Sequence, residues 1–282
     1  MYSCEPSKRW STLLVKMAKK LEIPHTDRKT GLVVIAHADD LALFCGATVL
    51  KLVDAGWNLE VVRVTDDAWD SWGSDELATK TDNQREFERA LSKLGVSKAH
   101  ELSYPTDRLG DVSEVEIRNR IIEVIRKVKP YLVMTFDPDS IRYEDNVDHR
   151  MVGIATTEAC WTAGFDKHPD GKVDQLRAHL PIERWYFGRT VLEATHEIEI
   201  APYKERLLDA VSEHKTMLTN MVAQLEVKSK FLGYELTELR TAVAKDPKYF
   251  AELIYRNRTV ENLRIIDGGE LHQVIERFGK PL

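Results

Sequence analysis

A histidine and two aspartates follow directly on an apolar run near the start of the chain. The run 32–36 leads into His37, and Asp39 and Asp40 come next. Because His37 and Asp40 are three residues apart, a nitrogen and a carboxylate oxygen can converge on one ion, and such ligands suit Zn²⁺. A catalytic zinc takes three protein ligands and leaves a position for water, so a third ligand must come from elsewhere. Asp39 would remain free as a general base for the bound water.

Taken alone, this stretch also fits a structural role. In that alternative His37 is a helix-capping or core histidine and the aspartates are N-caps, since aspartate is common at helix N-termini for electrostatic reasons. A second polar segment favours the metal site. It follows the apolar segment 131–136 and contains Asp148 and His149. His149 could supply the third ligand, and Asp148 could orient a neighbouring ring.

The elements that must position these residues alternate between strands and helices. The pattern predicts strands at 32–36, 59–65, 100–104 and 131–136, and helices at 42–55, 82–94, 115–129 and about 148–162. Ser113 and Glu116 form a capping-box pattern ahead of the third helix. The alternation predicts an α/β fold: a Rossmann-like, mostly parallel sheet with helices on both faces. Ligand sites in such sheets lie beyond the carboxyl ends of the strands, where both polar segments begin.

The remaining segments complete one predicted domain over residues 1–282. The first part reads as an amphipathic helix at about 5–22, and the α/β core extends over about 30–200. Segments 183–190 and 195–200 are predicted as later strands, added in antiparallel fashion. From about 201 to 282 the pattern is helical, and this C-terminal extension would cap the sheet or contact a second subunit of a homo-oligomer.

The two polar segments carry a resemblance to a known family. The chain is similar to the PIG-L/LmbE-like zinc-dependent N-acetyl-sugar deacetylases, in which a strand ends in A-H-P-D-D and a later strand ending near DPD is followed by H-P-D-H. The corresponding stretches here read AHADDLALFCGAT, from Ala36 to Thr48, and DPDSIRYEDNVDHR, from Asp137 to Arg150. The resemblance covers about 31–149 and continues weakly through a late helix that ends at His214.

This resemblance implies a role for each matching residue. His37, Asp40 and His149 would bind one zinc ion per chain, although similar ligands also hold Fe²⁺, Mn²⁺ or Co²⁺. Asp39 would be the general base, and Asp148 would be a supporting acid. The implied activity is hydrolytic removal of an N-acetyl group from an amino sugar or glycoside.

The chain departs from the family at Asn146, which replaces the first histidine of H-P-D-H. Asparagine can donate a hydrogen bond to an oxyanion, but it cannot shuttle a proton. The acid role would then pass to Asp39 after it takes the proton of the water. Two alternatives stay open: a zinc amidase for a non-sugar N-acyl substrate, and a catalytically impaired sugar-binding relative.

Several further residues are weaker candidates for substrate contact. Two tryptophans among four acids follow the strand 59–65, where they could stack on a sugar ring, and the acids favour an amine-bearing or polyhydroxy substrate. The other candidates belong to a following helix, to the second polar segment and to the late helix. The candidates are Trp69, Trp72, Arg85, Arg142, Tyr143 and His214.

The composition of the chain indicates which kinds of partner and which cellular location to expect. The 282 residues carry a net charge of -6, which argues against a nucleic-acid partner. The chain contains no apolar run of about 18 residues, so no membrane span is predicted. The three cysteines, Cys4, Cys45 and Cys160, are scattered and form no CxxC pair. They predict reduced thiols and a cytoplasmic location. The expected ligand is a small N-acetylated sugar or glycoside.

Overall fold

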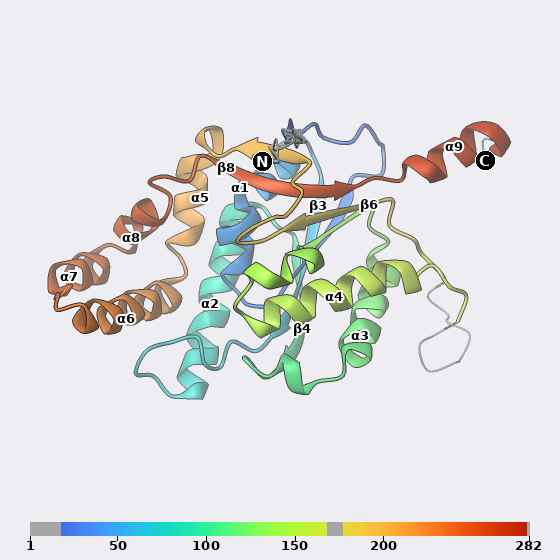
Figure 1. Ribbon diagram of the computed structural model, residues 1–282. Coiled ribbons are helices and arrows are strands. Elements are labelled where there is room, and N and C mark those ends of the chain that lie inside the picture. The colour runs from blue at the N-terminus through green and yellow to red at the C-terminus, as the bar shows by residue number, and fades with distance from the viewer. Residues whose placement is uncertain (1–17, 168–176, 281–282) are drawn as a thin grey trace, which may run out of the picture.

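The computed structural model describes residues 18–167 and 177–280 (Figure 1). Its centre is one eight-stranded sheet with the strand order β1-β7-β8-β6-β5-β2-β3-β4. The strands are β1 (Lys19–Lys20), β2 (Thr30–Ile35), β3 (Asn58–Thr65), β4 (Lys98–Tyr104), β5 (Leu132–Phe136), β6 (Glu183–Phe187), β7 (His196–Glu199) and β8 (Val260–Ile266).

Strands β2 to β6 form the parallel part of the sheet, as the alternating pattern predicts. β2 lies between β3 and β5, and both neighbours run parallel to it. Because helices cover both faces, the side chains of Leu32–Ile35 are fully buried, which explains an unbroken apolar run rather than an alternating one.

Two groups of helices lie on opposite faces of the sheet (Figure 1). Right-handed crossovers place α1 and α2 on one face, where α5 joins them, and α3 and α4 on the other. The described helices are α1 (Asp40–Asp54), α2 (Glu76–Leu94), α3 (Glu114–Val128), α4 (Val147–Thr162), α5 (Lys204–Val211), α6 (Lys215–Phe231), α7 (Thr237–Lys245), α8 (Pro247–Ile254) and α9 (Gly269–Phe278). None of the helices within the described ranges has the length and apolar character needed to cross a membrane.

The structure corrects the predictions at both ends of the chain. Of the helix predicted at 5–22, residues 5–17 lie outside the described residues, and Lys19–Lys20 form β1, which pairs in parallel with β7. The C-terminal part is not purely helical, because β8 inserts between β6 and β7 and runs antiparallel to both. The segment at 183–190 was expected to add in antiparallel fashion, but β6 runs parallel to β5.

Helix α3 begins without the predicted capping box. The side chain of Ser113 makes no capping hydrogen bond, and Glu116 instead accepts a hydrogen bond from the Tyr104 hydroxyl at 3.0 Å. The Glu116 carboxylate, which would have completed the capping box, therefore contacts Tyr104 at the end of β4 instead.

Candidate functional site

The HADD turn is closed by one of its own side chains. Asp40 is the first residue of α1, and its Oδ2 accepts hydrogen bonds from the backbone N–H groups of Ala36 at 3.1 Å and His37 at 2.7 Å. The backbone N–H of Ala38 donates to Oδ2 of buried Asp67 at 3.1 Å, which ties the turn to the end of β3. These bonds direct the other oxygen of Asp40 away from the turn.

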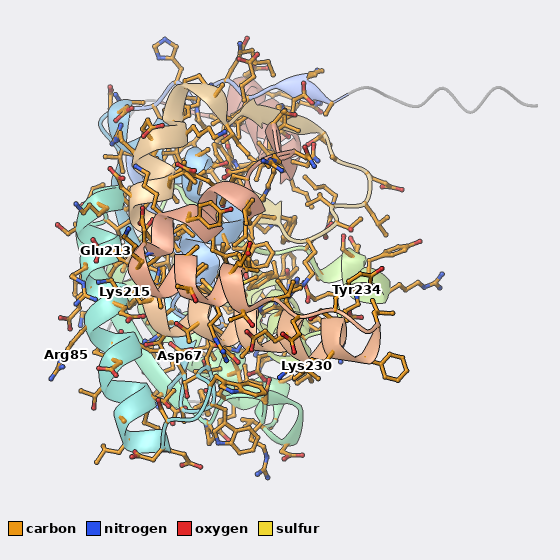
Figure 2. The ribbon with its side chains drawn as sticks, turned by 90° about the vertical axis from the view of Figure 1, so that its left-hand side faces the viewer. Asp67, Arg85, Glu213, Lys215, Lys230 and Tyr234 are labelled. Carbon is orange, nitrogen blue, oxygen red and sulfur yellow. The ribbon has the colours of Figure 1, made fainter. Side chains whose placement is uncertain are left out.

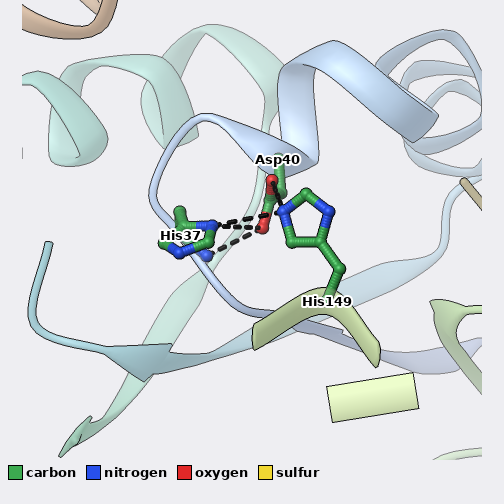
Figure 3. Close-up of side chains that lie close together, drawn as sticks. All are labelled: His37, Asp40 and His149. Carbon is green, nitrogen blue, oxygen red and sulfur yellow. Dashed lines mark hydrogen bonds and ion pairs between the residues drawn. The ribbon is translucent and has the colours of Figure 1, made fainter. Parts of the chain in front are cut away.

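Three buried side chains meet beside this turn (Figure 3). Nδ1 of His37 lies 3.2 Å from Nε2 of His149, and the same Nε2 lies 3.1 Å from Oδ1 of Asp40. Two imidazole nitrogens and one carboxylate oxygen, all within 4.8 Å of one another, form a donor set of the kind that binds zinc.

The electrostatics of the three residues also suit a cation. Burial alone would raise the pKa of Asp40, but His149 and His37 outweigh it and hold that pKa well below its usual range. Burial alone would lower the pKa of both histidines, but Asp148 and Asp40 raise the pKa of His37, and Asp40 raises that of His149. The site thus attracts protons that a divalent metal ion would replace.

Each imidazole turns its second nitrogen toward another carboxylate. Nε2 of His37 lies 3.3 Å from Oδ2 of Asp148, and Nδ1 of His149 lies 3.2 Å from Oε1 of Glu144. Asp148 is itself held by the backbone N–H groups of Asp107 and Leu109, at 2.7 Å and 3.1 Å. Carboxylates placed behind histidines in this way fix the tautomer and orientation of metal-binding rings.

A second group, His37, Asp107 and Asp148, also brings its ligand atoms within 4.8 Å of one another. It would use a ring nitrogen of the same His37, and Asp107 is exposed to solvent. The fully buried group of His37, Asp40 and His149 has two nitrogen ligands and is therefore the better zinc site.

Packing against β5 and α1 fixes the ring of His149. The ring stacks on Phe136 with centroids 4.1 Å apart, and Phe44 meets it edge-on at 5.5 Å. Gly153 brings α4 close to β5, since a Cβ there would lie 2.8 Å from the carbonyl oxygen of Phe136. The first turn of α4 therefore carries His149 to the end of β2.

Asp39 faces a cleft of about 490 Å³ beside the three clustered side chains. It stands at the N-cap position of α1, but its side chain makes no capping hydrogen bond. Burial, followed by the nearby charges of Asp70 and Asp40, raises the pKa of Asp39 well above its ordinary value. A carboxylate with a raised pKa is a stronger base, and this one is free to contact a ligand in the cleft.

Asn146 also lines the cleft, at the N-cap of α4. Its Oδ1 accepts hydrogen bonds from the backbone N–H groups of Asp148 at 2.8 Å and His149 at 3.3 Å. With Oδ1 occupied, the donor end of the amide makes no hydrogen bond to the described part of the chain. Asn146 can therefore donate to a ligand while it holds the helix start.

The weaker substrate candidates divide into two groups. Trp69 and Trp72 line the cleft and are about half exposed, at 51% and 55%. The other four do not line it. Arg85 projects from the outer surface of α2, 3.8 Å from Asp82 (Figure 2), and Arg142 and Tyr143 are exposed in a short 3₁₀ turn (Pro138–Tyr143).

His214 is buried just before α6 rather than in the cleft. Burial lowers the pKa of His214 to about 4, so the ring is neutral near pH 7. Its Nε2 finds no hydrogen-bond partner among the described residues. His214 therefore does not line the cleft beside His37, Asp40 and His149, and it is not placed to contact a ligand there.

Sequence reasoning did not single out several residues that the structure brings to this site. Glu144 lies five positions before His149 in a loop that had drawn attention through its neighbours Arg142 and Tyr143. The other residues come from distant segments, including a wall of the cleft formed by α6. They are Asp107, Arg189, Met217, Asn220, Met221 and Gln224.

Residues 32–160 match the family model PIG-L, described as GlcNAc-PI de-N-acetylase. The segment 32–160, which is less than half of the chain, is therefore similar to the PIG-L family. The matched segment contains His37, Asp40 and His149 with the elements that carry them, and it stops well before α5, α6 and β8.

Two protein sequences and one solved structure are also similar to this chain. The diacetylchitobiose deacetylase of Thermococcus kodakarensis is 35% identical over 160 residues, a match that spans 55% of this chain and 58% of that protein. A probable N-acetyl-α-D-glucosaminyl L-malate deacetylase of Bacillus anthracis is 24% identical over 209 residues, or 69% and 84% of the two chains. The structure of the N,N'-diacetylchitobiose deacetylase of Pyrococcus horikoshii shares the fold with a TM-score of 0.65 at 20% identity. The match covers 87% of this chain and 86% of that chain.

Proposed function

We propose that this protein is a metal-dependent hydrolase that removes the N-acetyl group from an amino sugar or glycoside. One observation carries the proposal: His37, Asp40 and His149 converge beside an open cleft that Asp39 also lines, and the Asp39 side chain makes no capping hydrogen bond. The match of residues 32–160 to the PIG-L family model supports the same activity, as do the names of both sequence relatives. We propose zinc as the metal, with one ion per chain.

His37, Asp40 and His149 would hold the ion, and Asp148 and Glu144 would orient the two rings. When bound, a divalent metal ion polarises a carbonyl oxygen and lowers the pKa of a bound water. The chain's own residues would then move the protons and hold the substrate in place.

Asp39 is placed to accept a proton from the water that attacks the amide carbonyl. Asn146 donates a hydrogen bond from its amide nitrogen to the carbonyl oxygen as negative charge develops there. The protonated Asp39 then gives its proton to the amine nitrogen as the C–N bond breaks, which yields acetate and a free amine. Trp69 and Trp72 offer exposed ring faces on which the sugar can stack.

The direct test is acetate release from a panel of N-acetylated amino sugars and glycosides, with N-acetylated amino acids as non-sugar amides. Zinc-loaded protein is expected to release acetate from at least one sugar and to act poorly on the amino acids. Release from the amino acids alone would indicate an amidase for non-sugar substrates. If neither set releases acetate while one zinc is bound per chain, the proposed deacetylase is wrong. A catalytically impaired sugar-binding protein, in which Asn146 replaces the usual histidine, then becomes the better explanation.

Asn146 can be tested separately from its role as a helix cap. Asn146→Ser keeps an N-cap of similar strength but lacks the amide donor, so kcat is expected to fall by about 10²- to 10³-fold with little change in Tm. Asn146→Ala removes both functions and is expected to lower kcat and Tm together. Unchanged acetate release by the serine variant would mean that the amide does not contact the developing oxyanion.

A further inference from the structure

Helix α1 is broken close to the clustered side chains. Cys45 has φ of −141° and ψ of 20°, which lies outside the helical region. The short part before it, 40–44, carries Asp40 and Phe44 to the cleft, whereas the part after it packs into the core. A break of this kind leaves carbonyl groups on one side and N–H groups on the other without their helical partners.

A glutamate from β8 satisfies the N–H side of the break. Glu261 accepts hydrogen bonds from the backbone N–H groups of Ala47 at 2.8 Å and Thr48 at 2.9 Å, and from the Thr48 hydroxyl at 2.7 Å. Its side chain belongs to the interior, with only 1% of the residue exposed. The Glu261 carboxylate therefore lies at the N-terminus of the second part of the helix, where the helix dipole favours a negative charge.

The carbonyl side is satisfied by residues just ahead of β8. The hydroxyl of buried Tyr255 lies within donating distance of the carbonyl oxygens of Ala42 and Leu43, at 3.0 Å and 3.1 Å. The guanidinium of Arg258 also donates to the carbonyl of Leu43 and, at 3.4 Å, to that of Phe44. Both sides of the break are therefore held by one seven-residue segment, 255–261.

This segment acts on the geometry of the candidate metal site through the short part 40–44. That part contains the ligand Asp40 and also Phe44, whose ring meets the ring of His149 edge-on. A continuous helix would fix the direction of its first turn by its own hydrogen bonds. Here the direction depends instead on contacts made more than 200 positions further along the chain.

We propose that the segment 255–261 is a positioning clamp that sets Asp40 and Phe44 against His149, with Glu261 and Tyr255 as its main contacts. The inference rests on the proposed metal site and adds to it residues outside the matched family region, 32–160. It makes metal affinity depend on side chains that do not touch the metal. Outer contacts of metal ligands typically change metal affinity by about 10- to 100-fold when removed.

The test measures Zn²⁺ affinity by competition with a chelator, the absorption spectrum of bound Co²⁺, and the Tm of the metal-free protein. Tyr255→Phe removes one hydroxyl, and Glu261→Gln keeps the shape of the side chain but replaces one acceptor by a donor. Exposed residues of α8 provide the matched controls, Tyr249→Phe and Glu252→Gln. All affinities are measured well below the Tm of each variant.

Both clamp variants are expected to weaken Zn²⁺ binding by about tenfold and to alter the Co²⁺ spectrum, while the controls match the wild type. If Tm falls but Zn²⁺ affinity and the Co²⁺ spectrum stay unchanged, the segment only supports the fold and the proposal is wrong. Should Glu261→Gln fail to fold, the milder Tyr255→Phe decides alone.

The readouts keep this inference apart from the proposed activity. A wild-type protein that binds Zn²⁺ but releases no acetate would contradict the deacetylase and leave the clamp to be judged by the metal affinities. A wild-type protein that binds no Zn²⁺ at the three residues would overturn both.

Discussion

Replacing Asp39 with asparagine is expected to lower kcat for acetate release by about 10²- to 10⁴-fold while Zn²⁺ binding persists. Asparagine has nearly the same shape, but it cannot take a proton from the attacking water or return it to the amine. Because the Asp39 side chain makes no capping hydrogen bond, the substitution removes little structural support. The change is therefore expected in kcat rather than in KM.

Acetate release and bound zinc would be measured on the same samples. Asp82→Asn, on the exposed surface of α2, is the matched control and is expected to behave as the wild type. Retention of full activity by the Asp39 variant would rule out Asp39 as the base. A loss of zinc in parallel with activity would instead make Asp39 a contributor to metal binding.

The cluster of His37, Asp40 and His149 could be predicted from sequence because short motifs at strand ends determine it. In a parallel sheet, β2 and β5 are neighbours and end at the same edge, so polar residues that follow them must meet there. The spacing within the HADD turn also fixes which oxygen of Asp40 remains available, since the other closes the turn. Local geometry thus carried most of the information about this cluster.

The rest of the site depends on contacts between distant segments, which sequence periodicity does not encode. The helical pattern of α6 says nothing about which cleft its side chains line, and Glu261 reads as an ordinary charge in a late segment. The break at Cys45 was likewise missed, because residues 42–55 have a continuous helical pattern. The backbone groups at that break find their partners in the distant segment 255–261.

The strand β1 also depends on a contact between distant segments. Lys19 and Lys20 have no strand-like periodicity, and their extended conformation follows from pairing with β7. Arg85 was a candidate because its helix follows the loop of Trp69 and Trp72, but its side chain lies on the face of α2 that turns toward solvent. The order of the elements along the chain does not determine which face of α2 carries Arg85 into contact with the cleft or with solvent.

Replacement of His149 by glutamine is expected to abolish tight zinc binding together with acetate release. His149 supplies the nitrogen that lies 3.1 Å from Oδ1 of Asp40 and 3.2 Å from Nδ1 of His37, so its loss leaves a site with two ligands. The wild type should gain about 2.7 kcal/mol of unfolding free energy when free Zn²⁺ is at 100 times its Kd, because only the folded chain holds the complete site. The variant should show almost none of this gain.

Thermal unfolding with and without added Zn²⁺ would measure the effect, and His25→Gln, at an exposed position, provides the control. Chelator treatment of the wild type should reproduce the loss of activity, and added Zn²⁺ should restore it there but not in the His149 variant. Equal zinc-dependent increases in Tm for wild type and variant would mean that the stabilising ion binds elsewhere. Since the ring of His149 also stacks on Phe136, the metal-free variant is expected to unfold at a somewhat lower temperature, and the zinc-dependent difference, rather than the absolute Tm, therefore isolates the ligand role.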